Sequence, residues 1–233
     1  MKENLTEVVF VLDRSGSMHG LEKDTIGGFN GLIDKQRKAE GETDVTLVLF
    51  DDTYELVYDR IPVREVPELT EKTYEAGGCT ALYDAVGRTI DAVGKRLAGT
   101  PEGERPSKVL FVITTDGLEN ASREYNPSRV REMIRHQRDK YSWEFLFLGA
   151  NIDTVEVAED MGISASHAVS YRASSRGISD MYCFLGAFMD DPRPTGSWTR
   201  KKDALMKEGQ DEGKDTPSPA PPKARKKYPC TFD

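Results

Sequence analysis

The chain alternates between short runs of β-branched or aromatic residues and longer segments in which apolar residues recur with helical spacing. This alternation is typical of a sheet whose strands are connected by helices. Six runs have the length and composition of strands, namely residues 8–12, 45–50, 55–59, 109–114, 144–148 and 168–171. The pattern therefore predicts a doubly wound, Rossmann-like α/β fold with helices on both faces of the sheet.

The connection between the second and third runs is unusually short. Only residues 51–54 separate them, whereas a helical crossover between parallel strands needs about a dozen residues or more. These two strands are therefore expected to form an antiparallel hairpin. The other strands are far enough apart in the sequence to pair in parallel.

The helices are indicated by spacing and by residues at their ends. Apolar residues from Leu82 to Leu97 follow the i, i+3, i+4 pattern, which predicts an amphipathic helix beginning just after Thr80. Asn126 followed by proline predicts the start of another helix. Gly162 is expected to end a further helix, and residues 178–189 are expected to supply the last one.

The first helix is expected at about residues 21–37 and contains three glycines. Gly27, Gly28 and Gly31 each cost roughly 1 kcal/mol relative to alanine in an exposed helix interior. Close packing of this helix against the sheet is the compensation that we expect.

A change of composition at residue 191 marks the expected end of the domain. Residues 191–233 contain seven of the twelve prolines and the stretch TPSPAPPKARKK. Such a segment buries too little apolar surface to order itself. We therefore expect one folded domain over residues 1–190 and a disordered Pro/Lys-rich tail over residues 191–233.

The two parts differ in charge. The whole chain has a net charge of -8. Residues 191–233 carry ten Lys or Arg and seven Asp or Glu, so this tail has a charge of +3 and residues 1–190 have a charge of -11. An acidic domain is poorly suited to nucleic acid. A nucleic-acid-associated scaffold that uses the basic tail nevertheless stays open as an alternative.

The sequence also indicates a compartment. The longest apolar runs are strand-sized and far below the roughly 20 residues that span a bilayer, and residues 1–7 are polar. We therefore expect a cytoplasmic protein without a membrane segment. The three cysteines, Cys79, Cys183 and Cys230, form an odd set without zinc-ligand spacing, which favours reduced thiols.

The most informative peptide stands directly after the first strand. Asp13, Ser15 and Ser17 place a carboxylate and two hydroxyls at alternating positions. In open α/β sheets, ligands bind beyond the carboxyl ends of the strands. The fourth strand also ends in an acid, Asp116, and Thr80 lies at the start of the amphipathic helix. If the first and fourth strands are neighbours, all five side chains converge.

Two carboxylates and three hydroxyls form a set of oxygen donors. Such donors suit a hard cation that prefers near-octahedral coordination and keeps some water, so Mg²⁺ fits best and Mn²⁺ or Ca²⁺ are alternatives. The two carboxylates match the charge of the ion and the hydroxyls add none, which leaves the bound ion able to attract a further anion.

The DxSGS peptide at residues 13–17, Thr80 and the TDG at residues 115–117 together resemble the metal-ion-dependent adhesion site (MIDAS) of von Willebrand factor type A domains. The resemblance covers about residues 5–190 and is to the stand-alone bacterial or phage type. It implies a sheet in the order 3-2-1-4-5-6 with the third strand antiparallel, and it allows metal occupancy to be coupled to the last helix.

The resemblance also implies roles for the site residues. Ser15 and Ser17 would bind the metal directly, Asp13 would act largely through water, and Thr80 and Asp116 would bind directly or through water. An Asp or Glu of a partner protein would complete the metal shell. The expected function is thus a non-enzymatic interaction module; its oligomeric state is left open.

The main alternative is a metal-dependent phosphatase or hydrolase, because an acid after the first strand can be a nucleophile. An aspartyl-phosphate enzyme would carry a second acid where this chain has Ser15, and Arg14 is the only cation near the peptide. Neither a Gly-x-x-x-x-Gly-Lys loop nor a Gly-x-Ser-x-Gly elbow is present in the sequence. The sequence therefore favours the binding module.

Overall fold

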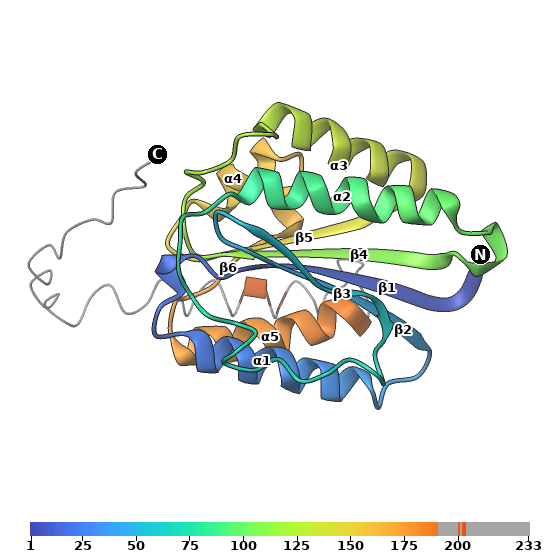
Figure 1. Ribbon diagram of the computed structural model, residues 1–233, viewed down its shortest axis with the longest axis horizontal. Helices are drawn as coiled ribbons and strands as arrows, with labels where there is room; N and C mark the ends of the chain where they lie inside the picture. The colour runs from blue at the N-terminus through green and yellow to red at the C-terminus, as the bar shows by residue number, and fades with distance from the viewer. Residues whose placement is uncertain (191–199, 201, 204–233) are drawn as a thin grey trace, which may run out of the picture.

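The computed structural model describes residues 1–190, 200 and 202–203. It is built around a six-stranded sheet in the order β3-β2-β1-β4-β5-β6 (Figure 1). The strands are β1 (Lys2–Asp13), β2 (Glu42–Phe50), β3 (Tyr54–Pro62), β4 (Pro106–Thr115), β5 (Glu144–Gly149) and β6 (Ala168–Ser170). All neighbours pair in parallel except β3, which is antiparallel to β2. The predicted fold class and strand order are confirmed.

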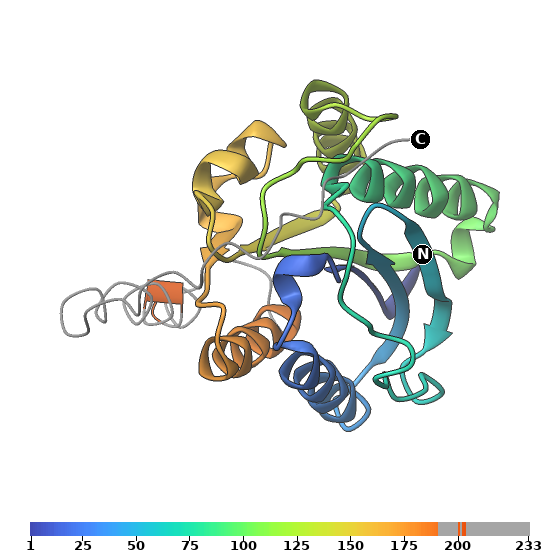
Figure 2. The same ribbon diagram turned by 60° about the vertical axis from the view of Figure 1, so that its left-hand side comes forward.

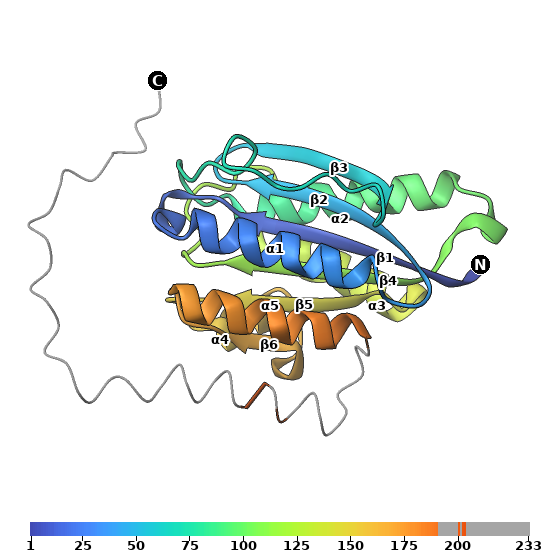
Figure 3. The same cartoon turned by 90° about the horizontal axis from the view of Figure 1, so that it is seen from below.

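Five helices cover the two faces of this sheet. They are α1 (Glu22–Gln36), α2 (Leu82–Gly99), α3 (Pro127–Tyr141), α4 (Thr154–Asp160) and α5 (Ser175–Asp190). One face carries α1 and α5, which lie side by side in Figure 3, and the other carries α2, α3 and α4 (Figures 1 and 2). The result is a three-layer α/β/α arrangement.

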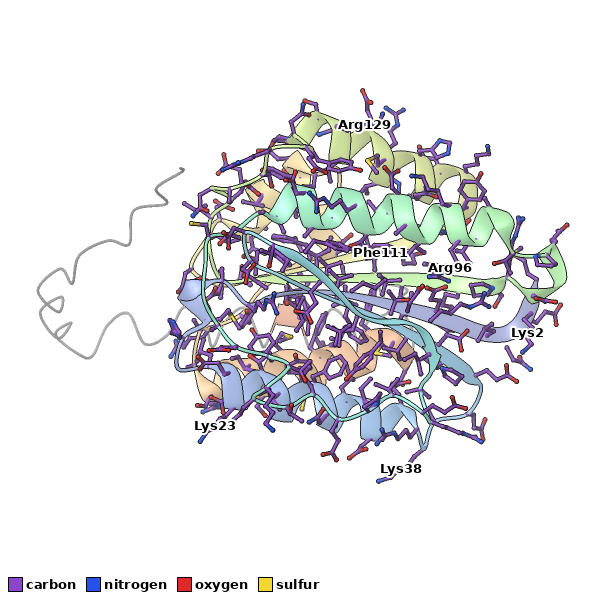
Figure 4. The ribbon with its side chains drawn as sticks, viewed as in Figure 1. Lys2, Lys23, Lys38, Arg96, Phe111 and Arg129 are labelled. Atoms are coloured by element: carbon purple, nitrogen blue, oxygen red, sulfur yellow. The ribbon has the colours of Figure 1, made fainter. Side chains whose placement is uncertain are left out.

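The central strand β1 is buried on both faces, which explains its continuous apolar run. Val8 and Phe10 belong to the core under α1 and α5, whereas Val9 and Val11 belong to the core under α2 and α3. On β4, Phe111 lies in the second core and is labelled in Figure 4. Burial on both sides fixes the register of β1 and β4, and this register positions the residues that follow them.

The hairpin of β2 and β3 confirms the predicted antiparallel pair, but β3 extends beyond the predicted residues 55–59. Its pairing with β2 contains irregularities, and Arg60 has a positive φ of 52°. The backbone N–H of Arg60 donates to the hydroxyl of Thr46 at 3.1 Å. A side chain of β2 thus supports the irregular backbone, which strand propensity alone does not predict.

The predicted helix ends are found in the structure. The side chain of Asn126 accepts a hydrogen bond from the backbone N–H of Arg129 at 2.9 Å and caps α3. Asp153 caps α4 by accepting from the backbone N–H of Glu156 at 3.0 Å. Gly162 follows α4 with a φ of 80°, a conformation that favours glycine.

Of the three glycines of α1, Gly28 lies against the neighbouring helix α5 rather than the sheet, which corrects the expectation from the sequence. A methyl group at Gly28 would overlap the ring of Tyr182 in α5. Gly28 therefore permits the close approach of the two helices. A methyl group at Gly27 or Gly31 would meet no atom of another described segment within 4 Å. Close packing thus compensates for the helix-destabilising effect of glycine at Gly28, but not at Gly27 or Gly31.

Helix α5 is described as far as Asp190. The tail predicted for residues 191–233 lies outside the described residues apart from 200, 202 and 203, and stays a prediction. None of the described helices combines the length and apolar character required to cross a membrane.

The cysteines only partly match the expectation of reduced thiols. Cys79 is disulfide-bonded, so that expectation is wrong for this residue. Cys183 is a free thiol. An odd number of cysteines argues against complete pairing, but it leaves room for a single bond.

Candidate metal centre

Asp13 and Asp116 leave the sheet at the same edge. Asp13 is the last residue of β1 and Asp116 directly follows β4; these strands pair in parallel with Leu12 opposite Thr114. Thr80 reaches this edge from the loop that precedes α2. The carboxyl ends of β1 and β4 lie at the left of the sheet in Figure 1. The structure thus brings the predicted segments together at one edge.

Asp13 is almost fully buried, with 1% of its surface exposed. Its Oδ1 accepts a hydrogen bond from the backbone N–H of Ser15 at 2.7 Å, and its Oδ2 accepts from the hydroxyl of Thr115 at 2.6 Å. Burial raises the pKa of Asp13 to about 6, although both hydrogen bonds act to lower it. The carboxylate is therefore held firmly in a position where its charge is poorly solvated.

The two serine hydroxyls link Asp13 to Asp116. The Oγ atoms of Ser15 and Ser17 lie 3.1 Å apart, and Ser17 Oγ donates to Asp116 Oδ1 at 2.5 Å. Asp116 is 2% exposed, and burial raises the pKa of its carboxyl group. Its Oδ2 is buried and has no hydrogen-bond partner among the described residues. A buried carboxylate oxygen of this kind is destabilising unless something else satisfies it.

Thr80 completes the group, and the glycine after Asp116 shows how tightly it is packed. A methyl group at Gly117 would lie 3.1 Å from Ser17 Oγ and 3.3 Å from Thr80 Oγ1. Both hydroxyls therefore face the same point of the backbone. The absence of a side chain at Gly117 leaves the space between the loops to the oxygen donors.

The five oxygen-bearing side chains fit a hard divalent cation. The donors are two carboxylates and three hydroxyls, and the unpartnered Asp116 Oδ2 is available as a ligand. Within the described residues there is no cluster of three or more His, Cys, Asp or Glu side chains that could hold a metal ion. A site here therefore depends on serine and threonine oxygens as well as on the two acids.

Backbone hydrogen bonds between loops hold these side chains in place. The N–H of Gly16 donates to the carbonyl of Gly78 at 3.1 Å, and the N–H of Gly77 donates to the carbonyl of Arg14 at 2.8 Å. Gly78 has a φ of 72°, and a side chain there would collide with Asp52. Gly78 is thus required by backbone conformation and by close packing, whereas a methyl group at Gly77 would meet no described atom within 4 Å.

Asn120 holds the backbone of Thr80 through two hydrogen bonds, a role that the sequence did not reveal. Its Oδ1 accepts from the backbone N–H of Thr80 at 2.9 Å, and its own N–H donates to the carbonyl of Thr80 at 3.0 Å. An asparagine four residues after a strand-end acid is too common a turn residue to signal this contact.

Acidic side chains anchor the rest of this loop on α2. The Glu119 carboxylate accepts from the backbone N–H groups of Tyr83, Ala121 and Ser122 at 2.7 to 3.1 Å. Further along, Asp84 of α2 accepts from three successive backbone N–H groups at 2.8 to 2.9 Å, those of residues 123–125. The segment from residue 117 to residue 125 is thus a braced loop.

Comparison with known proteins was informative at the level of structure only. No protein-family model and no curated protein matches the sequence. A solved structure of proximal thread matrix protein 1 from the mussel byssus, with a zinc-occupied MIDAS motif, is similar to this chain with a TM-score of 0.57 and 16% identity. The similarity covers 80% of this chain and 46% of the mussel chain. The chain has the von Willebrand factor type A fold.

A second structure with this fold comes from an archaeon. The ArnB paralog VWA2 from Sulfolobus acidocaldarius is similar with a TM-score of 0.51 and 16% identity, over 79% of this chain and 44% of the archaeal one. The present chain thus matches less than half the length of either neighbour. The similarity of this chain to both neighbours therefore concerns the type A fold rather than the whole protein.

Arg14 is turned toward the β2–β3 hairpin. Its guanidinium contacts Asp51 Oδ2 at 3.1 Å and Glu55 Oε2 at 2.5 Å, and it also donates to Thr53 Oγ1. Asp51 in addition accepts from the backbone N–H of Thr53 at 2.6 Å and so stabilises the turn of the hairpin. The cation of the DRSGS peptide is therefore neutralised by the β2–β3 hairpin.

Two further polar residues near the carboxyl ends of strands, His19 and Asp153, make other contacts. His19 is exposed, and its Nδ1 lies 3.1 Å from Glu22 Oε1. Asp153 serves α4 as a cap. The structure thus separates these polar residues from the five that converge.

Proposed function

We propose that this domain binds one divalent cation, Mg²⁺ in the cell, through Asp13, Ser15, Ser17, Thr80 and Asp116. We further propose that a carboxylate of a partner protein completes the coordination shell. When bound, the ion supplies the open coordination position that accepts this carboxylate. The domain acts as a non-enzymatic interaction module.

The observation that carries this proposal is the unpartnered Oδ2 of Asp116. The opposite oxygen, Oδ1, already accepts from Ser17, and burial raises the pKa of this carboxyl group and that of Asp13. Two neighbouring buried acids without a nearby cation destabilise one another. A divalent ion between them removes this destabilisation.

The donor set supports magnesium over zinc as the physiological ion. Zinc sites in proteins are dominated by sulfur and imidazole ligands, whereas carboxylate, hydroxyl and water oxygens suit Mg²⁺. The zinc in the MIDAS motif of the mussel neighbour supports a divalent ion at such a site. Mn²⁺ and Ca²⁺ are the alternatives to test beside Mg²⁺.

The contacts of Arg14 and Asp13 disfavour the phosphatase alternative. Phosphoryl transfer relies on cations that stabilise the charge of the transferring group, but Arg14 is held by Asp51 and Glu55. Both oxygens of Asp13 already accept hydrogen bonds, and its side chain is buried. A nucleophilic carboxylate must be accessible to the phosphorus atom, and the burial of Asp13 opposes this access.

Affinity capture from the native cell tests the binding role. The bait is used with Mg²⁺ and with EDTA, beside Asp13→Ala and the control Glu132→Ala, which changes an exposed acid of α3. A metal-bridged partner should be captured by the wild type and the control in Mg²⁺ only. Partners retained equally in EDTA and by Asp13→Ala would show that the interface does not use the metal.

A panel of phosphate esters tests the enzyme alternative separately. The wild type should show no turnover above that of Asp13→Asn in Mg²⁺ or Mn²⁺. Turnover that is robust in the wild type and disappears in the variant would replace the binding module with a hydrolase.

A further inference from the structure

Leu118 is an exposed apolar side chain in the loop that carries Asp116. It is 65% exposed, and the other large hydrophobic side chains that are exposed among the described residues are Met1, Leu56 and Tyr141. Single exposed apolar residues are common on protein surfaces. The position of Leu118 at the metal centre is therefore what makes it informative.

The backbone places Leu118 at the rim of the donor group. It directly follows Gly117, where a methyl group would lie within 3.3 Å of the hydroxyls of Ser17 and Thr80. Consecutive Cα atoms are about 3.8 Å apart. The Leu118 side chain thus begins within one residue of the oxygen donors, and it is exposed to solvent while Asp116 is buried.

The loop holds Leu118 in a preformed position. On its C-terminal side, Glu119 accepts hydrogen bonds from the backbone of Tyr83, Ala121 and Ser122, and Asn120 is bound to Thr80 in both directions. Ordering a loop on binding reduces affinity. Because this loop is already braced in the folded protein, burial of Leu118 by a partner should contribute to affinity with little loss of loop entropy.

Two charged residues of the loops around this rim, Arg14 and Glu119, are engaged within the domain. Arg14 is paired with Asp51 and Glu55, and the Glu119 carboxylate accepts four hydrogen bonds from the α2 start and its own loop. A partner that reaches this surface therefore meets a centre for its carboxylate and an apolar side chain beside it. The spacing between these two contacts then determines which partner segment fits.

We propose that Leu118 is the apolar contact of the metal-dependent interface. The partner is a protein segment in which an apolar side chain lies two residues from the Asp or Glu that reaches the metal. Residues i and i+2 of an extended segment point to the same side, about 7 Å apart, so one such segment can present an acid to the donors and an apolar side chain to the adjacent Leu118. This inference rests on the proposed function of the site.

A displayed library of random nonapeptides with a central Asp or Glu tests this inference. Peptides are selected on the wild-type protein in Mg²⁺ and eluted with EDTA. Selected peptides should carry Leu, Ile, Val, Met or Phe two positions from the acid. Affinity should fall roughly tenfold or more in Leu118→Asn, as expected for the loss of a buried leucine side chain.

Two controls separate this effect from damage to the fold or the metal centre. Leu118→Asn should bind Mg²⁺ alone as the wild type does, with an unchanged melting temperature, because the side chain is exposed. Tyr141→Asn alters an exposed aromatic residue at the end of α3 and should bind the selected peptides normally.

The possible results distinguish a failure of the role of Leu118 from a failure of the proposed function. Selected peptides that need Mg²⁺ and the acid but show no apolar preference, or that bind Leu118→Asn equally well, would overturn the role of Leu118 and leave the proposed function standing. A selection without any peptide that needs both Mg²⁺ and the acid would overturn the proposed function, and the role of Leu118 with it.

Discussion

Ser17 donates a hydrogen bond of 2.5 Å to one oxygen of Asp116, a residue 99 positions later in the chain. The other oxygen of the same carboxylate is buried without a partner among the described residues. The hydrogen bond shows that the loop after β1 meets the loop after β4. The unpartnered oxygen shows that this meeting leaves one acceptor of Asp116 unsatisfied. A cation explains both features, because it satisfies the oxygen and offsets the charge of two neighbouring acids.

Asn120 is expected to control metal affinity without touching the metal. Asn120→Ala removes the acceptor for the backbone N–H of Thr80, so the Thr80 hydroxyl becomes less well positioned. We expect Mg²⁺ affinity to fall about tenfold, which corresponds to the loss of one hydrogen bond. Titration calorimetry measures this change. Asn120→Asp retains the acceptor and should recover most of the affinity; equal binding by Asn120→Ala would show that Thr80 needs no such support.

The response to metal should depend on pH through Asp13. Its pKa is about 6 in the metal-free folded protein, above the ordinary value of 3.8. The metal-free fold should therefore lose up to about 3 kcal/mol as pH rises from 4 to beyond 6, and the stabilisation by Mg²⁺ should increase over the same range. Melting temperatures with and without Mg²⁺ measure both effects, with Asp13→Asn as reference. If the wild type and the variant respond identically to pH, Asp13 is not the source of the pH dependence.

A buried ion pair far from the metal centre should control stability alone. Glu7 in β1 is fully buried and is bound by the guanidinium of Arg96, which extends from α2 toward the sheet in Figure 4. Arg96→Met should destabilise the fold by about 3 kcal/mol, because it leaves the Glu7 charge uncompensated. Urea unfolding measures the loss.

The matched double variant tests the cause of this loss. Adding Glu7→Gln to Arg96→Met should restore part of the stability, because the uncompensated charge is then removed. Mg²⁺ affinity should be unchanged in each variant that folds. A double variant less stable than Arg96→Met would indicate that the effect comes from lost packing of the arginine chain.

Two glycines of α1 should respond oppositely to the same substitution. Gly28→Ala places a methyl group into the Tyr182 ring and should destabilise the protein by about 1–3 kcal/mol. Gly31→Ala meets no neighbouring segment described by the structure and should stabilise it by up to about 1 kcal/mol through helix propensity. Thermal unfolding measures both effects. Equal effects would show that the contact with Tyr182 does not require glycine at position 28.

The sequence predicted those features that depend on local pattern and chain direction. Strand spacing is sufficient for the β3-β2-β1-β4-β5-β6 order once the family resemblance is added. Asp13 and Asp116 converge because parallel neighbouring strands end at the same edge. The hydroxyls of Ser15 and Ser17 then follow from their positions next to the end of β1, and that of Thr80 from its position just before α2.

Contacts between distant side chains and loop backbone could not be predicted in this way. Asn120 and Asp84 act on backbone N–H groups some 40 residues away, and no local pattern distinguishes such residues from ordinary turn or helix-surface residues. The glycines of α1 were assigned to the wrong neighbour for a related reason. Which helix lies against Gly28 depends on how α5 packs, not on the α1 sequence.

Titration of metal-free protein with MgCl₂ in a calorimeter, beside Asp116→Asn, tests the metal centre most directly. The wild type should bind one ion per chain. Asp116→Asn should show no saturable binding, and its metal-free melting temperature should be no lower than that of the wild type, because the substitution removes a poorly satisfied buried charge. Equal binding by both proteins, or no binding of Mg²⁺, Mn²⁺ or Ca²⁺ by the wild type, would contradict the account.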